Sequence, residues 1–322
     1  PITRSRLSRD QPDETLMGDE PAILLRGISK RFDDVTALEQ VDLEIASGRI
    51  LGFLGPNGAG KTTTIRILTG FLKPDAGSAE LLGHDMLDPA AAIEGRRRLG
   101  FVPEVAGLDA SRTGMWLLDY LAALQGQAST DRDGLVEALE LNQRDLHRPI
   151  GRLSKGTRQK INIIQGLQHR PDVLVLDEPG EGLDPLAKRA LFDVLKHTRD
   201  RGATIFFSSH VLGEVEALCD EVALIRNGRL GLVDHIDNVR RSMRRRVSLE
   251  LAEGIDAESR LRQLPTISEL ERDNSRWLFY VVDFDPLLKL LSELPVRDVV
   301  IEPPSLEEVF LQHYGEESEP RE

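Results

Sequence analysis

A glycine-rich segment at residues 55–63, GPNGAGKTT, carries the clearest chemistry in the sequence. It fits the spacing G-x-x-x-x-G-K-[ST], in which glycines let backbone N–H groups converge on phosphate oxygens. Lys61 can reach the β- and γ-phosphates of a nucleotide, and Thr62 can offer its hydroxyl to Mg²⁺. An apolar run, RILGFLG, leads into the segment and a helical pattern follows it. We therefore expect a strand, a loop and a helix whose positive end faces the anion.

Two adjacent carboxylates end a second apolar run, VLVLDEP, at residues 173–179. Carboxylates at the end of a buried strand are costly unless a cation compensates them. A Mg²⁺ held through Asp177 would compensate them, and Glu178 could then orient or deprotonate a water that attacks the γ-phosphate. Any strand can end in Asp-Glu before a turn, so the pair indicates a catalytic site only because the sequence also contains the phosphate loop.

Two further segments fit phosphate chemistry, and each has a simpler structural interpretation. His210 follows the apolar run IFFSS, and its imidazole could reach the γ-phosphate if that strand joins the same sheet. A lone histidine is more often structural. The segment LSKGTRQK at 153–160 precedes the apolar run INIIQGL. Ser154 could simply cap a helix, or the helix start could form a second anion site.

The elements that position these residues follow from hydrophobic periodicity. Strands are expected at 22–32, 41–45, 49–55, 172–179 and 203–210, and helices at 63–72, 117–126, 134–142 and 186–202. Turns are expected at Asp33-Asp34 and at Asn227-Gly228, the second within a hairpin over 221–233. The alternation predicts an α/β domain with a largely parallel sheet over residues 21–235. A helix-rich insertion is expected at about 105–170, where strand signals vanish.

Residues 236–322 are expected to form a linker and a small α+β C-terminal domain. NVRRSMRRR has five arginines in its last seven residues, which we interpret as a solvated helical linker rather than a lipid contact. Strand, helix, two strands, helix and strand then follow between 247 and 302, the order of the split βαβ unit. A last helix is expected at 305–314, where Ser305 and Glu308 form a capping box. Residues 1–20 are polar and charged, and we expect a disordered tail.

Composition excludes several classes of protein. The net charge of −13 and the pI near 5.1 argue against a nucleic-acid partner, because phosphate neutralisation needs Lys and Arg. Cys219 is the only cysteine, so no internal disulfide is expected, and a reducing compartment fits. The sequence has no apolar run of about 18 residues that would cross a membrane. The N-terminus lacks the apolar region of a signal peptide.

The ordered motifs GPNGAGKTT, LSKGT, VLVLDEP, GLDP and SSH resemble those of ABC transporter ATP-binding subunits over about residues 22–235. The resemblance implies the P-loop NTPase fold of the ABC type, with ATP and Mg²⁺ as cofactors. It assigns adenine stacking to Phe32 and catalysis to Lys61, Glu178 and His210, and it assigns Mg²⁺ binding to Thr62, Asp177 and Glu104. The Walker A residues that would bind ATP are Gly55, Pro56, Asn57, Gly58, Ala59, Gly60, Lys61, Thr62 and Thr63.

The resemblance also implies two subunits that face head to tail and enclose two ATP molecules. The signature motif, which would bind the ATP of the opposite subunit, comprises Leu153, Ser154, Lys155, Gly156 and Thr157. The D-loop comprises Gly182, Leu183 and Asp184. Four residues depart from the family pattern. Lys155 and Thr157 replace Gly and Gln of the common LSGGQ, and Glu104 replaces the usual Gln. Glu181 stands where small hydroxylated residues are common and places an extra carboxylate near the interface.

The segments LSKGxxQ, Pro103-Glu104 and PSLEEVFL at 304–311 resemble the ABC-2 type exporters, including drug-resistance exporters. This implies an ATPase subunit, in a homodimer or heterodimer, that drives export through a separate transmembrane permease. The subunit would be peripheral, on the cytoplasmic side of the cell membrane. One alternative is a soluble ABC-type ATPase that acts on ribosomes or DNA, but the chain has one cassette and no heptad arms. Another is a non-hydrolysing nucleotide sensor, which the presence of Glu178 and His210 disfavours.

Overall fold

The computed structural model of the chain describes residues 21–105, 107–126, 131–242, 244–252, 255, 257–273 and 276–302. The expected tail at 1–20 and the expected helix at 305–314 lie outside these residues.

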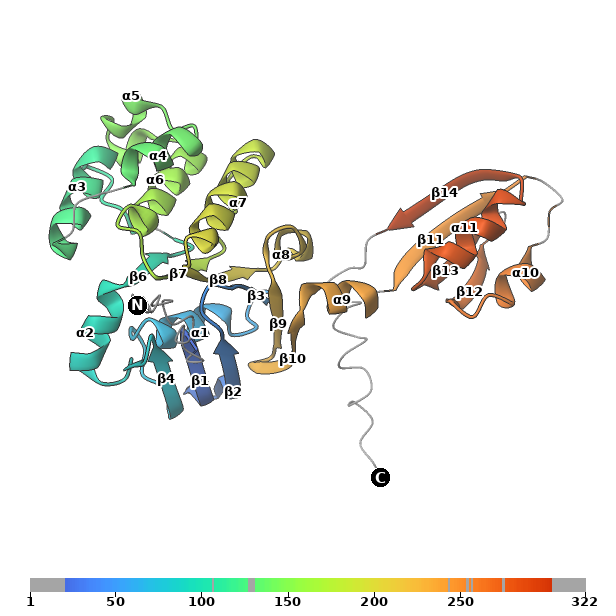
Figure 1. Cartoon of the computed structure of the whole chain (residues 1–322), viewed down its shortest axis with the longest axis horizontal. Coiled ribbons are helices and arrows are strands. Elements are labelled where there is room, and N and C mark those ends of the chain that lie inside the picture. The colour runs from blue at the N-terminus through green and yellow to red at the C-terminus, as the bar shows by residue number, and fades with distance from the viewer. Residues whose placement is uncertain are drawn as a thin grey trace, which may run out of the picture.

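A six-stranded sheet forms the centre of the first part of the chain, in the order β10-β9-β3-β8-β7-β6 (Figure 1). The strands are β3 (Ile50–Leu54), β6 (Leu99–Val102), β7 (Val173–Asp177), β8 (Thr204–Ser209), β9 (Glu221–Arg226) and β10 (Arg229–His235). All neighbours are parallel except β10, which pairs with β9 through the expected hairpin. Asn227 and Gly228 both have positive φ, as the tight hairpin turn requires. The prediction of a largely parallel sheet is confirmed.

A separate antiparallel sheet was not expected from the sequence. Its order is β2-β1-β4-β5, with β1 (Ile23–Phe32), β2 (Val35–Ile45), β4 (Ala76–Leu81) and β5 (His84–Asp85). The hairpin of β1 and β2 turns at Asp33, as predicted, with Phe32 opposite Val35. The sequence does not reveal that these strands leave the parallel sheet, because strand pairing is decided by packing between distant segments.

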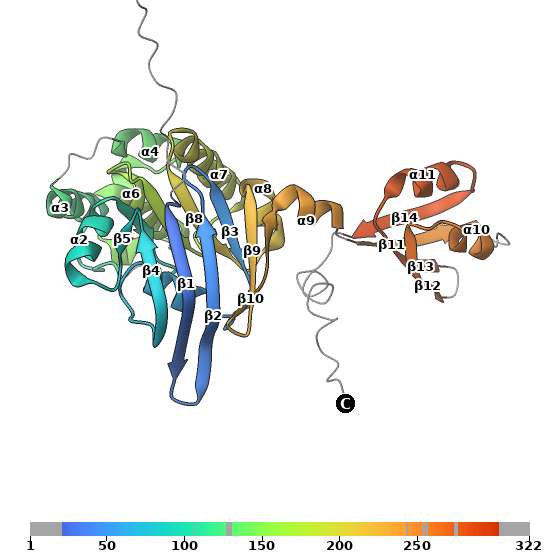
Figure 2. The same cartoon turned by 60° about the horizontal axis from the view of Figure 1, so that its bottom comes forward.

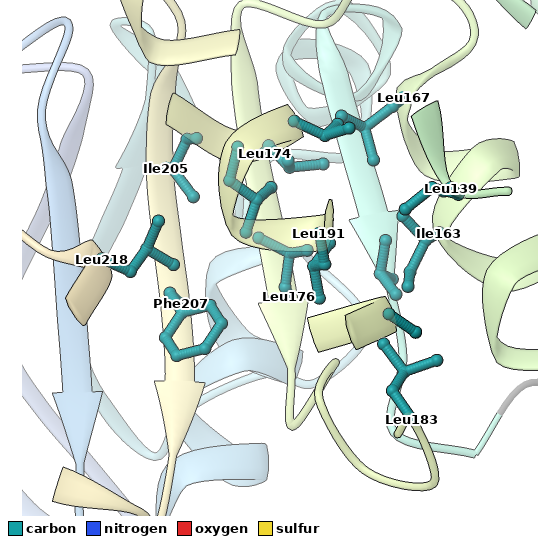
Figure 3. Close-up of a cluster of buried hydrophobic side chains, with 14 of the residues drawn as sticks. Leu139, Ile163, Leu167, Leu174, Leu176, Leu183, Leu191, Ile205, Phe207 and Leu218 are labelled. Carbon is teal, nitrogen blue, oxygen red and sulfur yellow. The ribbon is translucent and has the colours of Figure 1, made fainter. Parts of the chain in front are cut away.

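The central strands are buried on both faces, and their alternating side chains enter two different cores. On β7, Leu174 and Leu176 join the core that faces the helices, whereas Val173 and Val175 join the core shared with the antiparallel sheet. Figure 3 shows the first core, in which Leu176 lies with Leu183 and Leu191. Both carboxylates at residues 177–178 thus stand at the end of a strand that two cores hold rigid.

Helices pack around this sheet, and several end where glycine allows a left-handed backbone. They are α1 (Lys61–Leu68), α2 (Pro89–Arg97), α7 (Pro185–Asp200) and α8 (Leu212–Leu218). Helix α1 ends earlier than the expected residue 72, because Gly70 has a φ of 72°. Gly202, with a φ of 98°, follows the end of α7 as predicted. Helices α2 and α8 were not expected.

The helical insertion lies between β6 and β7, and the described part of it contains no strand. It consists of α3 (Gly114–Gln125), α4 (Arg132–Ala138), α5 (Gln143–Leu146), a 3₁₀ turn (Ile150–Arg152) and α6 (Lys155–Leu167). Figure 1 shows α3 to α6 grouped on one side of the sheet, away from β1, β2 and β4, and Figure 2 shows α3 and α4 at the far end of the domain from the hairpin of β1 and β2. The α6 helix packs on β6 and on α3 and α4, and Gln159 near its start donates to the carbonyl oxygen of Pro179, just after β7, at 2.9 Å.

The segment after α9 (Ile236–Ser242) forms a unit with its own core, which includes Leu249, Trp277 and Phe279. Its elements are β11 (Arg245–Leu251), α10 (Glu258–Arg262), β12 (Ile267–Asp273), β13 (Arg276–Val281), α11 (Phe284–Ser292) and β14 (Val296–Glu302). The antiparallel sheet has the order β12-β13-β11-β14, which is the split βαβ arrangement.

Three described arginines of the basic segment make contacts within the chain, and the interpretation of the segment as a solvated linker stays a prediction. Arg240 contacts Asp237 at 3.2 Å and Arg244 contacts Glu269 at 3.0 Å. The guanidinium of Arg245, already inside β11, lies 5.8 Å from the centre of the Phe284 ring. Among the described residues, no helix combines the length and the apolar character that crossing a membrane requires.

Candidate active site

The loop between β3 and α1 needs glycine at two positions for steric reasons. A Cβ on Gly55 would lie 2.4 Å from the carbonyl oxygen of Ile225. Gly60 has a φ of 112°, and a Cβ there would lie 2.8 Å from the carbonyl oxygen of Ala37. The backbone therefore turns tightly against the neighbouring strands, and α1 begins immediately at Lys61.

The ammonium of Lys61 is held by this loop and by the end of β7. Its Nζ donates to the carbonyl oxygens of Gly55, at 2.7 Å, and Pro56, at 3.3 Å. The same Nζ lies 3.2 Å from Oε1 of Glu178. The Lys61 side chain is only 6% exposed, so its cationic head is fixed rather than free in solvent.

Asp177 accepts hydrogen bonds on both carboxylate oxygens. Thr62 Oγ1 donates to Oδ2 at 2.9 Å, and Ser208 Oγ donates to Oδ1 at 2.7 Å. The Ser208 hydroxyl also accepts from the backbone N–H of Glu178 at 3.1 Å. Ser208 was missed in the sequence, although it lies in the SSH segment and a polar residue at the end of a buried strand was a usable signal.

Glu178 connects the phosphate loop with His210. Its Oε2 lies 2.9 Å from Nδ1 of His210, while Oε1 faces Lys61. Glu178 has a φ of 47°, a conformation that is uncommon for residues other than glycine and that clusters at functional sites. Two of the predicted catalytic residues, Lys61 and His210, thus lie on either side of the third.

A cavity of about 680 Å³ opens over these groups. It is lined by Val35, Thr36, Ala37, Pro56, Asn57, Gly58, Gly60, Lys61, Thr62, Thr63, Glu104, Glu178, Glu181 and His210. Gly55, Ala59 and Asp177 are not in the lining. Gly55 instead binds Lys61 through its carbonyl, Asp177 supports Thr62, and Ala59 is buried in the core between the sheets. The volume of the cavity lies within the range of small-molecule and cofactor sites, which includes a nucleoside triphosphate.

Phe32 does not line this cavity, in contrast to the expected adenine-stacking position. Its side chain is 44% exposed, and Lys30 Nζ lies 5.5 Å from the centre of its ring. The turn beyond it brings Val35, Thr36 and Ala37 to the cavity instead. The sequence analysis did not predict these three residues, because no local sequence pattern indicates that this strand contacts the phosphate loop. Stacking by Phe32 stays a prediction.

Glu104 lines the cavity together with Glu178 and Glu181. Burial raises the pKa of Glu104, and the negative charges of Asp177, Glu181 and Glu178 raise it further, against the opposing charge of Lys61. This position, which the family resemblance gives to Gln, therefore carries a carboxyl whose charged form is disfavoured by its surroundings.

The oxygen donors near the loop fit Mg²⁺ that is shared with phosphates. Thr62 and Asp177 lie side by side, and Glu104 lines the same cavity. Among the described residues, no group of three or more His, Cys, Asp or Glu side chains is arranged to hold a metal by itself. Mg²⁺ typically takes one or two protein oxygens and completes its octahedron with phosphate oxygens and water.

The expected signature residues lie outside the cavity. Ser154 caps α6, and its Oγ accepts from the backbone N–H of Thr157 at 3.1 Å. Leu153 is buried in the core. Gly156 lies close to Gly182, because a Cβ on Gly156 would be 3.0 Å from the carbonyl oxygen of Gly182. The helix-cap interpretation is therefore correct, and residues 153–157 do not line the cavity over the phosphate loop of their own chain.

The expected D-loop joins the turn that follows Glu178 to α7. Leu183 is anchored in the core that Figure 3 shows, and Gly182 has a φ of 77°. Asp184 caps α7 by accepting from the backbone N–H groups of Ala187, at 2.9 Å, and Leu186, at 3.0 Å. The hydrogen bond from Ala187, followed by that from Leu186, holds the pKa of Asp184 below its usual value against partial desolvation.

Comparison with known proteins gives the family. Residues 38–181 match the family model described as ABC transporter. The Nod factor export ATP-binding protein I of Ralstonia nicotianae is 33% identical over 328 aligned residues, which cover 96% of this chain and 98% of that protein. The daunorubicin/doxorubicin resistance ATP-binding protein DrrA of Streptomyces peucetius is 31% identical, over 93% of this chain and 94% of that protein.

A solved structure described as the ATP-binding subunit of an ABC transporter has a TM-score of 0.63 and 29% identity, and covers 68% of this chain and 92% of that one. The chain belongs to the family of ABC transporter ATP-binding proteins. The predicted family, the P-loop NTPase fold of the ABC type and the class of ABC ATPase are thereby confirmed.

Proposed function

We propose that the chain hydrolyses ATP with Mg²⁺ and thereby powers an ABC-2 type exporter. The observation that carries this proposal is the position of Glu178, whose two carboxylate oxygens face Lys61 and His210 beside the cavity of the phosphate loop. A binding module without hydrolysis would have no use for a carboxylate held in a strained backbone conformation at this position.

The residues around the cavity divide the chemistry between them. The backbone of residues 55–63 and Lys61 would hold the triphosphate and stabilise the charge that develops during phosphoryl transfer. Glu178 would orient or deprotonate the attacking water, and His210, in contact with Oε2, would hold the carboxylate and reach toward the γ-phosphate. Thr62, Asp177 and Glu104 would hold Mg²⁺, which neutralises phosphate charge when bound.

The signature segment supports a dimer in which each subunit completes the site of the other. Ser154 starts α6 at the surface, and residues 153–157 do not line the cavity of their own chain. A helix start with a free approach from solvent is a natural anion site. We infer that this end of α6 binds the γ-phosphate of ATP held by a second subunit, whether identical or different.

The transported compound would pass through a transmembrane permease, with this chain bound to its cytoplasmic side. Relatives named for Nod factor export and for daunorubicin and doxorubicin resistance match nearly the whole chain. Their names support export rather than import, and they support a membrane partner rather than ribosomes or DNA. They differ in substrate, which agrees with specificity residing in the permease.

Two measurements test the proposal. The purified protein should release phosphate from ATP only when Mg²⁺ is present. When the chain is purified from its native host in mild detergent, a polytopic membrane protein should copurify in stoichiometric amount. Absence of Mg²⁺-dependent phosphate release would refute the assigned chemistry. Copurification of ribosomal or nucleic-acid material in place of a membrane protein would refute the exporter assignment.

A further inference from the structure

Two of the charged departures from the family pattern, Lys155 and Glu181, meet in space. Nζ of Lys155, in the signature segment, lies 2.5 Å from Oε1 of Glu181, in the turn that follows Glu178. The residues are 26 positions apart, so the contact joins the helical insertion to the turn that follows Glu178 at the end of β7. Each charge alone is an unexplained substitution, whereas together they form one ion pair.

Lys155 and Glu181 connect the start of α6 with the turn that follows Glu178, so a movement of one of these segments would displace the other. Lys155 is the first residue of α6 and directly follows the capping residue Ser154. Glu181 lines the phosphate-loop cavity, and its backbone N–H donates to the carbonyl oxygen of Glu178 at 3.1 Å. The ion pair therefore spans from the proposed phosphate-binding helix end to the turn that carries the catalytic carboxylate.

The aliphatic part of Lys155 fits against a position that only glycine can fill. A Cβ on Gly182 would lie 2.9 Å from both Cγ and Cδ of Lys155, and Gly182 has a positive φ. The lysine stem thus crosses the D-loop backbone before its ammonium reaches Glu181. This fit argues that the contact is a defined arrangement and not a chance meeting of two surface charges.

A second link, made by buried atoms, runs parallel to the ion pair. Gln159, one turn further along α6 and 7% exposed, donates from Nε2 to the carbonyl oxygen of Pro179 at 2.9 Å. The α6 start and the 178–182 turn are therefore already in contact, and the ion pair fixes their outer ends. Without it the α6 start and the turn would keep only the Gln159 hydrogen bond and the close approach of Gly156 to Gly182.

We propose that Lys155 and Glu181 are positioning residues that hold the start of α6 in register with the turn carrying Glu178. This inference rests on the proposed function, because it concerns how the signature end of one subunit and its own hydrolytic turn move together during turnover. The pair is half exposed, with side chains 64% and 47% accessible, so it adds little to stability. We therefore expect loss of the ion pair to change kcat rather than the free energy of unfolding.

Steady-state ATP hydrolysis by the full chain tests this with four proteins: wild type, Lys155→Gln, Glu181→Gln and the double variant. Each single variant should lower kcat by about three- to tenfold, a range typical of coupled neighbours. The KM for ATP should change less than about twofold, since neither residue holds the triphosphate. The double variant should be no slower than the slower single variant, because both substitutions break the same contact.

Lys155→Arg should keep at least about half of the wild-type kcat, because a guanidinium can form the same pair with a carboxylate. A matched control is the ion pair of Arg98 and Asp172, at 2.7 Å with side chains 52% and 53% exposed, at the opposite end of the sheet. The corresponding variants, Arg98→Gln and Asp172→Asn, should keep wild-type kcat.

Multiplicative losses in the double variant, or wild-type kcat in both single variants, would overturn the inference. These outcomes leave the proposed function standing, because the wild-type protein measured beside the variants still hydrolyses ATP. Absence of hydrolysis by the wild type would overturn the proposed function first, and the inference that rests on it.

Discussion

Nζ of Lys61 lies 3.2 Å from Oε1 of Glu178, so one ammonium contacts both the phosphate loop and the carboxylate at the end of β7. The Lys61 side chain is 6% and the Glu178 side chain 10% exposed. A buried pair of this kind is costly to break, because removal of one partner leaves an uncompensated charge. Lys61, which we propose binds phosphate, and Glu178, which we propose activates water, are therefore positioned by each other.

Glu178→Gln should keep ATP binding and lose most turnover. The amide keeps the size of the side chain but cannot accept a proton from water, so kcat should fall by about 10² or more, the range for loss of a general base. With ATP, the variant should accumulate as a stable dimer in size-exclusion chromatography. Wild-type hydrolysis by Glu178→Gln would contradict the role assigned to this carboxylate.

Ser154→Arg should separate ATP binding from dimer closure. The new side chain would block the start of α6, which lies outside the cavity of its own chain. ATP binding to the monomer, measured by titration calorimetry, should be unchanged, while ATP-dependent dimers and hydrolysis are lost. Ser154→Asn keeps a capping side chain and serves as the control for folding. Loss of ATP binding in the Ser154→Arg monomer would argue against binding in trans.

Ser208→Ala should lower both stability and turnover. Ser208 Oγ donates to Asp177 and accepts from the backbone N–H of Glu178, and its loss leaves buried polar groups unpaired at a cost of about 1–3 kcal/mol. Because those groups orient both carboxylates, kcat should fall by about tenfold.

The neighbouring Ser209→Ala is the matched control for this variant. Ser209 is equally buried, but its Oγ donates to Glu214 and accepts from Val211 N–H. It should lose a similar free energy of unfolding, measured with urea, and keep wild-type kcat. Equal losses of kcat in both variants would show that the effect is general loosening rather than carboxylate orientation.

Asp131→Asn should destabilise the chain at neutral pH but not in acid. Asp131 contacts Arg201 at 2.6 Å and Arg170 at 3.1 Å, which joins α4 to the C-terminal ends of α6 and α7. Burial, the largest single influence, raises the pKa of Asp131, but the hydrogen bonds and charges of Arg201 and Arg170 together hold it below its usual value.

A lowered pKa in the folded state means that the ionised carboxylate stabilises the fold above the unfolded pKa of about 3.9, and that this contribution is lost as the pH falls through the folded pKa. Urea unfolding at pH 7 should show a loss of about 1 kcal/mol in the variant. The difference should shrink when the same measurement is made below about pH 3.9, as the pH approaches the lowered pKa of the folded state. A difference that stays constant with pH would show that packing, and not charge, is responsible.

Much of the site could be predicted from local sequence, because each of its parts depends on neighbours in the chain. Residues 55–63 contain the glycines, the lysine and the threonines in the order that the loop requires. The apolar run before Asp177 predicts a buried strand with carboxylates at its end, and the capping of α6 by Ser154 follows from its place before an apolar helix. These features are set by backbone geometry over fewer than about ten residues.

Distances between segments could not be predicted in the same way. No pattern in β1 and β2 shows that their strands form a second sheet, or that Val35, Thr36 and Ala37 rather than Phe32 line the cavity. Lys155 and Glu181 are separately visible as departures, but nothing near either residue indicates that they meet at 2.5 Å.

The sequence by itself determined the loop, the strand ends and the helix caps, since these follow from glycine freedom, hydrophobic periodicity and hydrogen bonds between near neighbours. Only the tertiary structure decided that Lys61, Glu178 and His210 form one contact chain, and that α6 is tied to the turn beside them. The physical reason is that parallel strands join segments more than a hundred residues apart, and the packing of two cores sets which strand ends become neighbours.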